Sequence, residues 1–222
     1  MKAARVGVLR DTPEHQAPRV RDLPAPRKAE GAAGGAMQRM FAWPYRAILA
    51  FLLWTGVRPY QLTLSSLGLS AIAGWQILVG NWLAAGIALS IGGMCDVFDG
   101  SVARHRGEQK RSGAFMDSVL DRVADMILFS CLFWALAERS DRLDSGLALV
   151  TLIVSLSVSQ IRAEAEAVGV RLTEGFFQRL ERFLALLAGL MIPGMMRPVL
   201  IALAALGALT VLQRTWSALA RA

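Results

Sequence analysis

Four aspartates lie close together in a stretch of sequence that is otherwise strongly apolar. Asp96 and Asp99 are three residues apart and Asp117 and Asp121 are four apart, so each pair shares one face of any helix that carries it. A short basic connection separates the pairs, and two antiparallel helices would bring them together. Carboxylates without a partnering His or Cys select Mg²⁺, Mn²⁺ or Ca²⁺ rather than zinc or copper. The spacing therefore predicts a metal site.

The charge of these carboxylates also points to bound cations. An ionised Asp at bilayer depth costs at least about 2.5 to 3.5 kcal/mol. Two ions that also bind waters and substrate phosphate oxygens would use all four acids, and two-metal sites are typical of phosphoryl chemistry. Gly100 and Gly113 leave backbone accessible to a ligand, and Arg104 offers a planar fork for phosphate. Together these residues predict a site for a diphosphate.

The composition places this site in a membrane protein. The chain has 222 residues, of which 55% are hydrophobic, and a formal charge of +7. A soluble domain is rarely so apolar. Cys95 and Cys131 lie in apolar runs without metal-ligand spacing, so they indicate buried thiols rather than a disulfide or zinc site. We expect membrane lipid as a partner and no nucleic acid.

The predicted fold is an all-α integral membrane protein with six transmembrane helices, preceded by an interfacial amphipathic helix. Residues 1–36 read as a flexible cytoplasmic tail, 37–57 as the juxtamembrane amphipathic helix, begun by Pro44, and 58–222 as the membrane domain. If 37–57 spans instead, there are seven spans. The six predicted spans are approximately 61–79, 82–104, 114–138, 145–168, 176–193 and 197–215.

Basic residues predict the orientation of these spans. Most Lys and Arg lie in the tail, in the 104–112 connection, in the 162–182 region and at the C-terminus. Such residues gather on the cytoplasmic side of a membrane. Both termini are therefore expected in the cytoplasm, with the aspartates at the cytoplasmic ends of the second and third spans, where nucleotides have access.

The aspartate stretch matches a known signature without a gap. The matching positions are Asp96, Asp99, Gly100, Ala103, Arg104, Gly113, Asp117 and Asp121. On this order and spacing the chain resembles the CDP-alcohol phosphotransferases, also called CDP-alcohol phosphatidyltransferases. The resemblance runs from about residue 37 to 216.

The resemblance implies a reaction and the residues that support it. A polyol hydroxyl would attack the β-phosphorus of CDP-diacylglycerol (CDP-DAG), releasing CMP and forming a phospholipid. The signature aspartates would bind two Mg²⁺ or Mn²⁺ ions, and Asp121 would also take the proton of the hydroxyl. The residues implied in CDP-DAG binding are Thr63, Gly100, Arg104, Lys110 and Gly113. The resemblance further implies a homodimer.

Two residues near the signature have open roles. The alternative for Thr63 is a hydroxyl that bonds its own helix. Asp125 lies one turn beyond Asp121, and we expect it to support the site or to pair with Arg122.

Three arginines resemble the acceptor-binding residues of bacterial phosphatidylinositol phosphate synthases. Arg162, Arg182 and Arg214 match basic positions that hold the phosphate of the acceptor in those enzymes. The alternative is that these arginines anchor to lipid headgroups. Gln160 and Glu164 depart from the pattern. The matching arginines favour inositol 1-phosphate as the polyol phosphate acceptor, and these two departures leave glycerol 3-phosphate as the alternative.

A cation transporter is the rival from another functional class, because buried acids in a bundle also mark ion pathways. A conducting path needs acids throughout the depth of the membrane. The predicted fourth to sixth spans carry none at their centres, which favours the enzyme.

Overall fold

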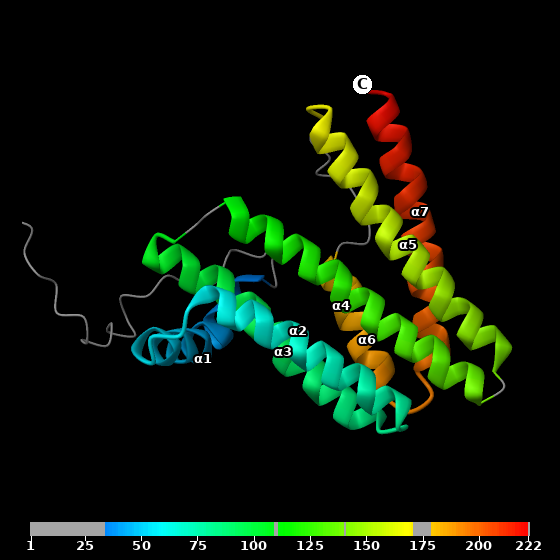
Figure 1. Ribbon diagram of the computed structural model, residues 1–222, viewed down its shortest axis with the longest axis horizontal. Helices are drawn as coiled ribbons and strands as arrows, with labels where there is room; N and C mark the ends of the chain where they lie inside the picture. Colours follow the sequence, from blue (N-terminus) through cyan, green and yellow to red (C-terminus); the bar gives the residue numbers. More distant parts are fainter. Residues whose placement is uncertain (1–33, 109–110, 140, 171–178, 222) are drawn as a thin grey trace, which may run out of the picture.

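The computed structural model describes residues 34–108, 111–139, 141–170 and 179–221, which form seven α-helices (Figure 1). Most of the predicted tail and Lys110 lie outside the described residues. The helices are α1 (Gly34–Trp54), α2 (Pro59–Leu78), α3 (Trp82–Arg106), α4 (Arg111–Glu138), α5 (Arg142–Ala167), α6 (Arg179–Met191) and α7 (Met196–Leu219).

Each predicted apolar segment corresponds to one helix, but the start of the first helix was predicted wrongly. α1 begins at Gly34, ten residues before Pro44, which lies inside the helix. A proline removes one backbone hydrogen bond of a helix and leaves the turns on either side able to form. Beyond Pro44, Leu49 and Ala50 are buried in a small core shared with α3, which holds this half of α1 in place.

The apolar surface of the protein agrees with a membrane environment. α3, α5 and α7 are long and apolar enough to cross a membrane, yet at most 39% of the most apolar stretch of each is buried inside the protein. Large apolar side chains such as Leu83, Ile153 and Leu212 face outward. The all-helical architecture is confirmed, whereas six spans stay a prediction. α6 has 13 residues in its described part, and a span needs about 20.

Tight glycine turns reverse the chain at the ends of α2 and α3. Gly80 has a φ of 82°, and Gly107 has a φ of 66°, a conformation that costs glycine little. At the second turn the N–H of Glu108 donates to the carbonyl of Ala103 at 3.0 Å, which closes the last turn of α3. α4 therefore runs back antiparallel to α3 (Figure 1).

α2 holds α3 and α4 at a distance from each other. It packs against both, whereas α3 and α4 do not pack together in the part of the chain that the structure describes. α5 packs on α4 and α7, and α6 packs on α3 and α7. One main core, with fully buried Leu132 and Leu200, joins these helices. Cys95 and Cys131 are free thiols, and both are half-buried rather than fully buried as predicted.

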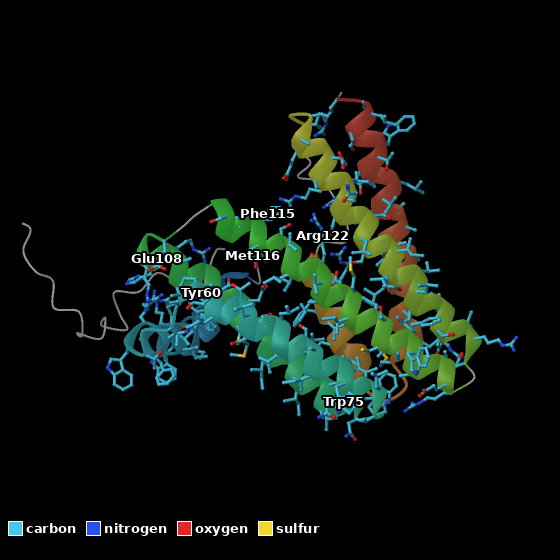
Figure 2. All side chains as sticks on the ribbon, viewed as in Figure 1. Tyr60, Trp75, Glu108, Phe115, Met116 and Arg122 are labelled. Atoms are coloured by element: carbon cyan, nitrogen blue, oxygen red, sulfur yellow. The ribbon has the colours of Figure 1, made fainter. Side chains whose placement is uncertain are left out.

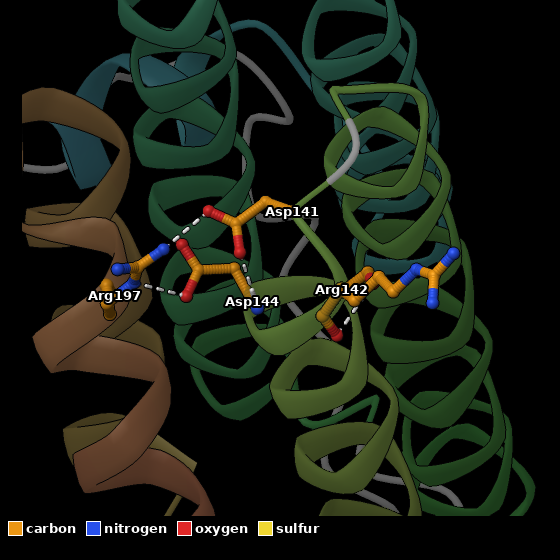
Figure 3. Close-up of polar contacts among 5 residues, drawn as sticks. Asp141, Arg142, Asp144 and Arg197 are labelled. Atoms are coloured by element: carbon orange, nitrogen blue, oxygen red, sulfur yellow. Dashed lines mark hydrogen bonds and ion pairs between the residues drawn. The ribbon is translucent and has the colours of Figure 1, made fainter.

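An ion-pair clamp joins α5 and α7 where α5 begins (Figure 3). Arg197 contacts Asp144 through Nε at 2.7 Å and Asp141 through Nη2 at 2.5 Å. The pKa of Asp141 lies below its ordinary value, chiefly because the backbone N–H of Asp144 donates to its carboxylate, and secondarily because of Arg197. The clamp fixes the pair of helices whose other halves carry Arg162 and Arg214.

Candidate active site

The predicted acidic cluster forms between α3 and α4. Carboxylate oxygens of Asp96, Asp99 and Asp117 all lie within 4.8 Å of one another. The first two residues lie in the C-terminal half of α3, and the third lies in the second turn of α4. Because the chain reverses between these helices, the carboxylates meet across the space between them, as their spacing predicted.

Thr63 of α2 orients the one buried carboxylate of this cluster. Asp99 is 7% exposed, and its Oδ2 accepts a hydrogen bond of 2.6 Å from Thr63 Oγ1. The same hydroxyl lies 3.2 Å from the carbonyl oxygen of Pro59. A hydroxyl has one proton, and a bond to an ionised carboxylate is the stronger of the two. Thr63 therefore supports the cluster, and its contact with CDP-DAG stays a prediction.

The cluster fits a hard divalent cation. Two oxygens on opposite sides of Mg²⁺ are about 4.2 Å apart, because each Mg–O distance is about 2.1 Å. The oxygens of the cluster are spread over at most 4.8 Å, and all of them belong to carboxylates. This donor set suits Mg²⁺ or Mn²⁺ rather than zinc.

Asp121 stands apart from the group of three. It lies one turn beyond Asp117 on α4 and lines the same cavity, but its carboxylate is outside the tight cluster. Asp96, Asp117 and Asp121 thus line one cavity, and Asp99 joins the first two in the tight cluster beside it. The role of Asp121 as a base stays a prediction.

A cavity of about 730 Å³ extends from the acidic cluster toward α5, α6 and α7. The polar and charged residues that line it are Thr63, Ser66, Ser70, Asp96, Asp117, Ser118, Asp121, Arg122, Asp125, Ser159, Arg162, Glu166, Arg182 and Arg214. Phe115 and Met116 directly precede Asp117 and are exposed (Figure 2). These apolar side chains neighbour Asp117 in the sequence of α4 and lie on the outer surface of the protein.

The three predicted arginines reach this cavity from three helices. Arg162 of α5 pairs with Glu166 at 2.9 Å and is well exposed. Arg214 of α7 is 7% exposed, and its Nη1 donates to the carbonyl of Val158 at 3.2 Å. Arg182 of α6 completes the group. All three arginines line the cavity, and their role in binding the phosphate of an acceptor stays a prediction.

A glycine on α3 lets α6 come close enough to supply Arg182. A Cβ at Gly93 would lie 2.4 Å from Cζ of Phe183, so only glycine leaves room for this ring. Gly93 and Phe183 both line the cavity. The contact sets the start of α6 beside the acidic cluster, and no local pattern in the sequence indicated it.

The remaining signature residues have different surroundings. A Cβ at Gly100 would lie 3.3 Å from Nη1 of Arg104, so the guanidinium folds against the glycine. A Cβ at Gly113 would have no neighbour within 4 Å among the described residues, which leaves its surface open to a ligand. Lys110 lies outside the described residues. CDP-DAG binding by this group stays a prediction.

Asp125 has a partner that the sequence analysis missed. Its Oδ2 accepts a hydrogen bond of 2.8 Å from Ser155, which is 2% exposed. Arg122, labelled in Figure 2, has Nη2 3.5 Å from the carbonyl oxygen of Ser159. Of the two roles predicted for Asp125, pairing with Arg122 is therefore not found among the described residues, whereas Asp125 does line the cavity. Ser155 and Ser159 share one face of an apolar helix, and this repeat was the available signal.

Curated relatives of this chain act in inositol lipid synthesis. The phosphatidylinositol phosphate synthase of Corynebacterium glutamicum is 36% identical over 166 residues, covering 71% of this chain and 76% of the relative. The archaetidylinositol phosphate synthase of Methanothermobacter thermautotrophicus is 35% identical over 158 residues, covering 69% and 78%.

Solved structures share the fold. The Mycobacterium tuberculosis phosphatidylinositol phosphate synthase with CDP-DAG bound has a TM-score of 0.71 at 29% identity, covering 78% of this chain and 92% of that chain. The structure of that enzyme with manganese and citrate has a TM-score of 0.72 at 29% identity, covering 78% and 87%. The manganese complex agrees with the hard-cation site.

The family model described as CDP-alcohol phosphatidyltransferase matches residues 57–216. This range contains the aspartate signature, all three arginines and helices α2 to α6, together with most of α7. The chain belongs to the CDP-alcohol phosphatidyltransferase family.

Proposed function

We propose that this protein transfers the phosphatidyl group of CDP-DAG to inositol 1-phosphate, with release of CMP. One observation carries the proposal. A single cavity is lined at one end by the acidic cluster and elsewhere by three arginines from three helices. The first group suits a metal-bound diphosphate, and the second suits the phosphate of an acceptor. The similarity to phosphatidylinositol phosphate synthases, one of them with CDP-DAG bound, supports the same pair of substrates.

The residues divide the reaction between them. Asp96, Asp99, Asp117 and Asp121 would hold two divalent ions, whose positive charge would offset that of the diphosphate and of CMP. Asp121 accepts the proton of the acceptor hydroxyl. The hydroxyl oxygen bonds to the β-phosphorus as the bond from that phosphorus to the CMP oxygen breaks. Arg104 binds phosphate oxygens of CDP-DAG through its fork.

Two departures from the synthase pattern lie outside the cavity. Gln160 Nε2 donates to Glu164 Oε1 at 2.6 Å on the exposed side of α5, and neither residue lines the cavity. The cavity therefore keeps the three arginines and not the two substitutions, which favours inositol 1-phosphate over glycerol 3-phosphate.

We place this activity in an N-in, C-in bundle of six spans, α2 to α7, that forms homodimers, with α1 lying in the cytoplasmic interface. Trp43 and Trp54 of α1 are exposed, and tryptophan is enriched at the level of the lipid headgroups. A transporter is disfavoured because, in the part of the chain that the structure describes, α3 and α4 alone supply the carboxylate cluster.

The test is a reaction of detergent-solubilised protein with CDP-DAG and four separate acceptors: inositol 1-phosphate, glycerol 3-phosphate, free inositol and serine. CMP release should be fastest with inositol 1-phosphate and should require Mg²⁺ or Mn²⁺. Undiminished turnover in excess EDTA would contradict the metal assignment. A faster reaction with an unphosphorylated acceptor would contradict the arginine site.

Arg182→Ala tests the acceptor site directly. Loss of a charge-assisted contact should raise the KM for the acceptor roughly tenfold to a hundredfold and change the KM for CDP-DAG little. Arg142→Ala is the matched control, because Arg142 is exposed and begins α5 (Figure 3), whereas the cavity arginine of that helix, Arg162, lies near its end. Equal effects of the two variants would show that the acceptor does not contact Arg182.

A further inference from the structure

A hydroxyl between α1 and α3 connects the two helices to the signature arginine. Ser101 Oγ lies 2.7 Å from Tyr45 Oη, 3.0 Å from Arg104 Nη2 and 3.0 Å from the carbonyl oxygen of Val97. Ser101 has one proton, which it donates to the carbonyl, and it accepts from Arg104. Tyr45 must therefore be the donor in its contact. All the hydrogen-bonding capacity of Ser101 is then used.

The surroundings of this hydroxyl leave it little freedom. Ser101 is 5% exposed. The ring of Tyr45 stacks on Phe98 at a centroid distance of 5.1 Å and an interplanar angle of 23°. Leu49 of α1 and Val102 of α3 are both fully buried in the same small core. These contacts keep the phenol oxygen of Tyr45 in a fixed position beside Ser101.

Arg104 is exposed and is restrained on one edge only. Its Nη2 donates to Ser101, and Nη1 lies against Gly100, where a Cβ would be 3.3 Å away. Among the described residues, Ser101 is the hydrogen-bond partner of this guanidinium. The remaining N–H groups of the fork are available to a ligand.

We propose that Tyr45 is a positioning residue, which acts through Ser101 to aim Arg104 at the diphosphate of CDP-DAG. This inference rests on the proposed function and deepens it. The far side of α1 exposes Trp43 and Phe51, so a helix with an apolar outer face sets the geometry of the nucleotide site. An arginine held in advance loses less conformational freedom when it binds phosphate.

Tyr45→Phe keeps the ring and removes only the donor. The KM for CDP-DAG should rise about three- to tenfold, as loss of one hydrogen bond predicts, with kcat and the acceptor KM within about twofold. Ser101→Ala should reproduce the effect. Ser90→Ala, which removes another hydroxyl of α3 bonded to its own helix at 2.8 Å, should leave all constants unchanged.

A double-mutant cycle separates positioning from a merely structural role. In an Arg104→Ala background, Tyr45→Phe should change the KM for CDP-DAG no further, because the residue through which it acts is gone. The same full effect in both backgrounds would overturn the proposal. A lowered melting midpoint with an unchanged KM would also overturn it, because Tyr45 would then only anchor α1.

Turnover of the wild-type protein is measured first, so that a failure of the proposed function can be told apart from a failure of the positioning role of Tyr45. Absence of CMP release from CDP-DAG would refute the proposed function. Normal turnover with a KM in Tyr45→Phe equal to that of the wild type would refute only the positioning role. Binding of CDP-DAG measured by calorimetry in detergent, without acceptor, should show the same three- to tenfold loss of affinity in Tyr45→Phe, roughly one hydrogen bond.

Discussion

Replacement of Thr63 by valine should weaken metal binding without unfolding the protein. The substitution keeps the shape of the side chain and removes the hydroxyl that donates to Asp99 Oδ2 at 2.6 Å. Asp99 is 7% exposed, so water cannot readily take the place of the hydroxyl. A hydrogen bond to a charged group contributes about 1.5 to 3 kcal/mol. The carboxylate that loses it is a less well-oriented ligand.

This energy corresponds to a rise of about tenfold to a hundredfold in the metal concentration needed for half-maximal activity, the range typical of residues that orient metal ligands. The assay is CMP release at saturating CDP-DAG and acceptor, titrated separately with Mg²⁺ and Mn²⁺. Thr63→Ser restores the hydroxyl and should recover most of the wild-type metal dependence.

Thr151→Val is the matched control. Thr151 is 2% exposed, and its Oγ1 bonds the carbonyl of Leu147 at 2.8 Å on its own helix, away from the cavity. Its metal titration should equal that of the wild type. If Thr63→Val leaves the titration unchanged, or if both valine variants shift it equally, the orienting role of Thr63 is wrong.

Three further predictions concern other parts of the molecule. Asp121→Asn keeps shape but loses basicity, so turnover should fall at least about tenfold in folded protein; a wild-type rate would remove the base role. The pKa of Asp141 is lowered in the folded protein. The carboxylate therefore stabilises the fold fully at pH values above its ordinary pKa of about 3.9, and this contribution is lost as the pH falls through the lowered pKa. Melting midpoints in detergent should drop on that acid side, less steeply in Arg197→Met, and an identical slope would exclude the clamp as a cause. Gly93→Ala would place a methyl group 2.4 Å from Phe183, which should destabilise the protein by about 1 to 3 kcal/mol; an unchanged melting midpoint would mean that the ring moves freely.

Residue type and local spacing were enough to predict the metal chemistry. The i, i+3 pair Asp96 and Asp99 shares a face of α3, and Asp117 and Asp121 share a face of α4, as helical periodicity requires. Hydrophobic runs likewise predicted the six helices α2 to α7, because each apolar segment forms its own backbone hydrogen bonds and needs no partner to do so.

Local periodicity could not predict where α1 begins or which helices lie between others. Pro44 is an effective helix breaker in isolation, yet α1 continues through it while packing on α3. The sequence predicted that two antiparallel helices bring the carboxylates together, but not that α2 packs against both helices beside a cavity. The start of α1 and the position of α2 both depend on how helices pack against one another. A proline or an apolar run in the sequence carries no information about that packing.

The sequence by itself therefore determined which residues are candidates to bind metal and phosphate, and tertiary structure decided which side chains hold those candidates in position. Thr63 with Asp99, Ser155 with Asp125 and Tyr45 with Ser101 are pairs that lie 36, 30 and 56 residues apart. No spacing rule links such distant positions. Each bond exists because buried polar groups must find partners, and the partner available to each is set by which helix faces pack together.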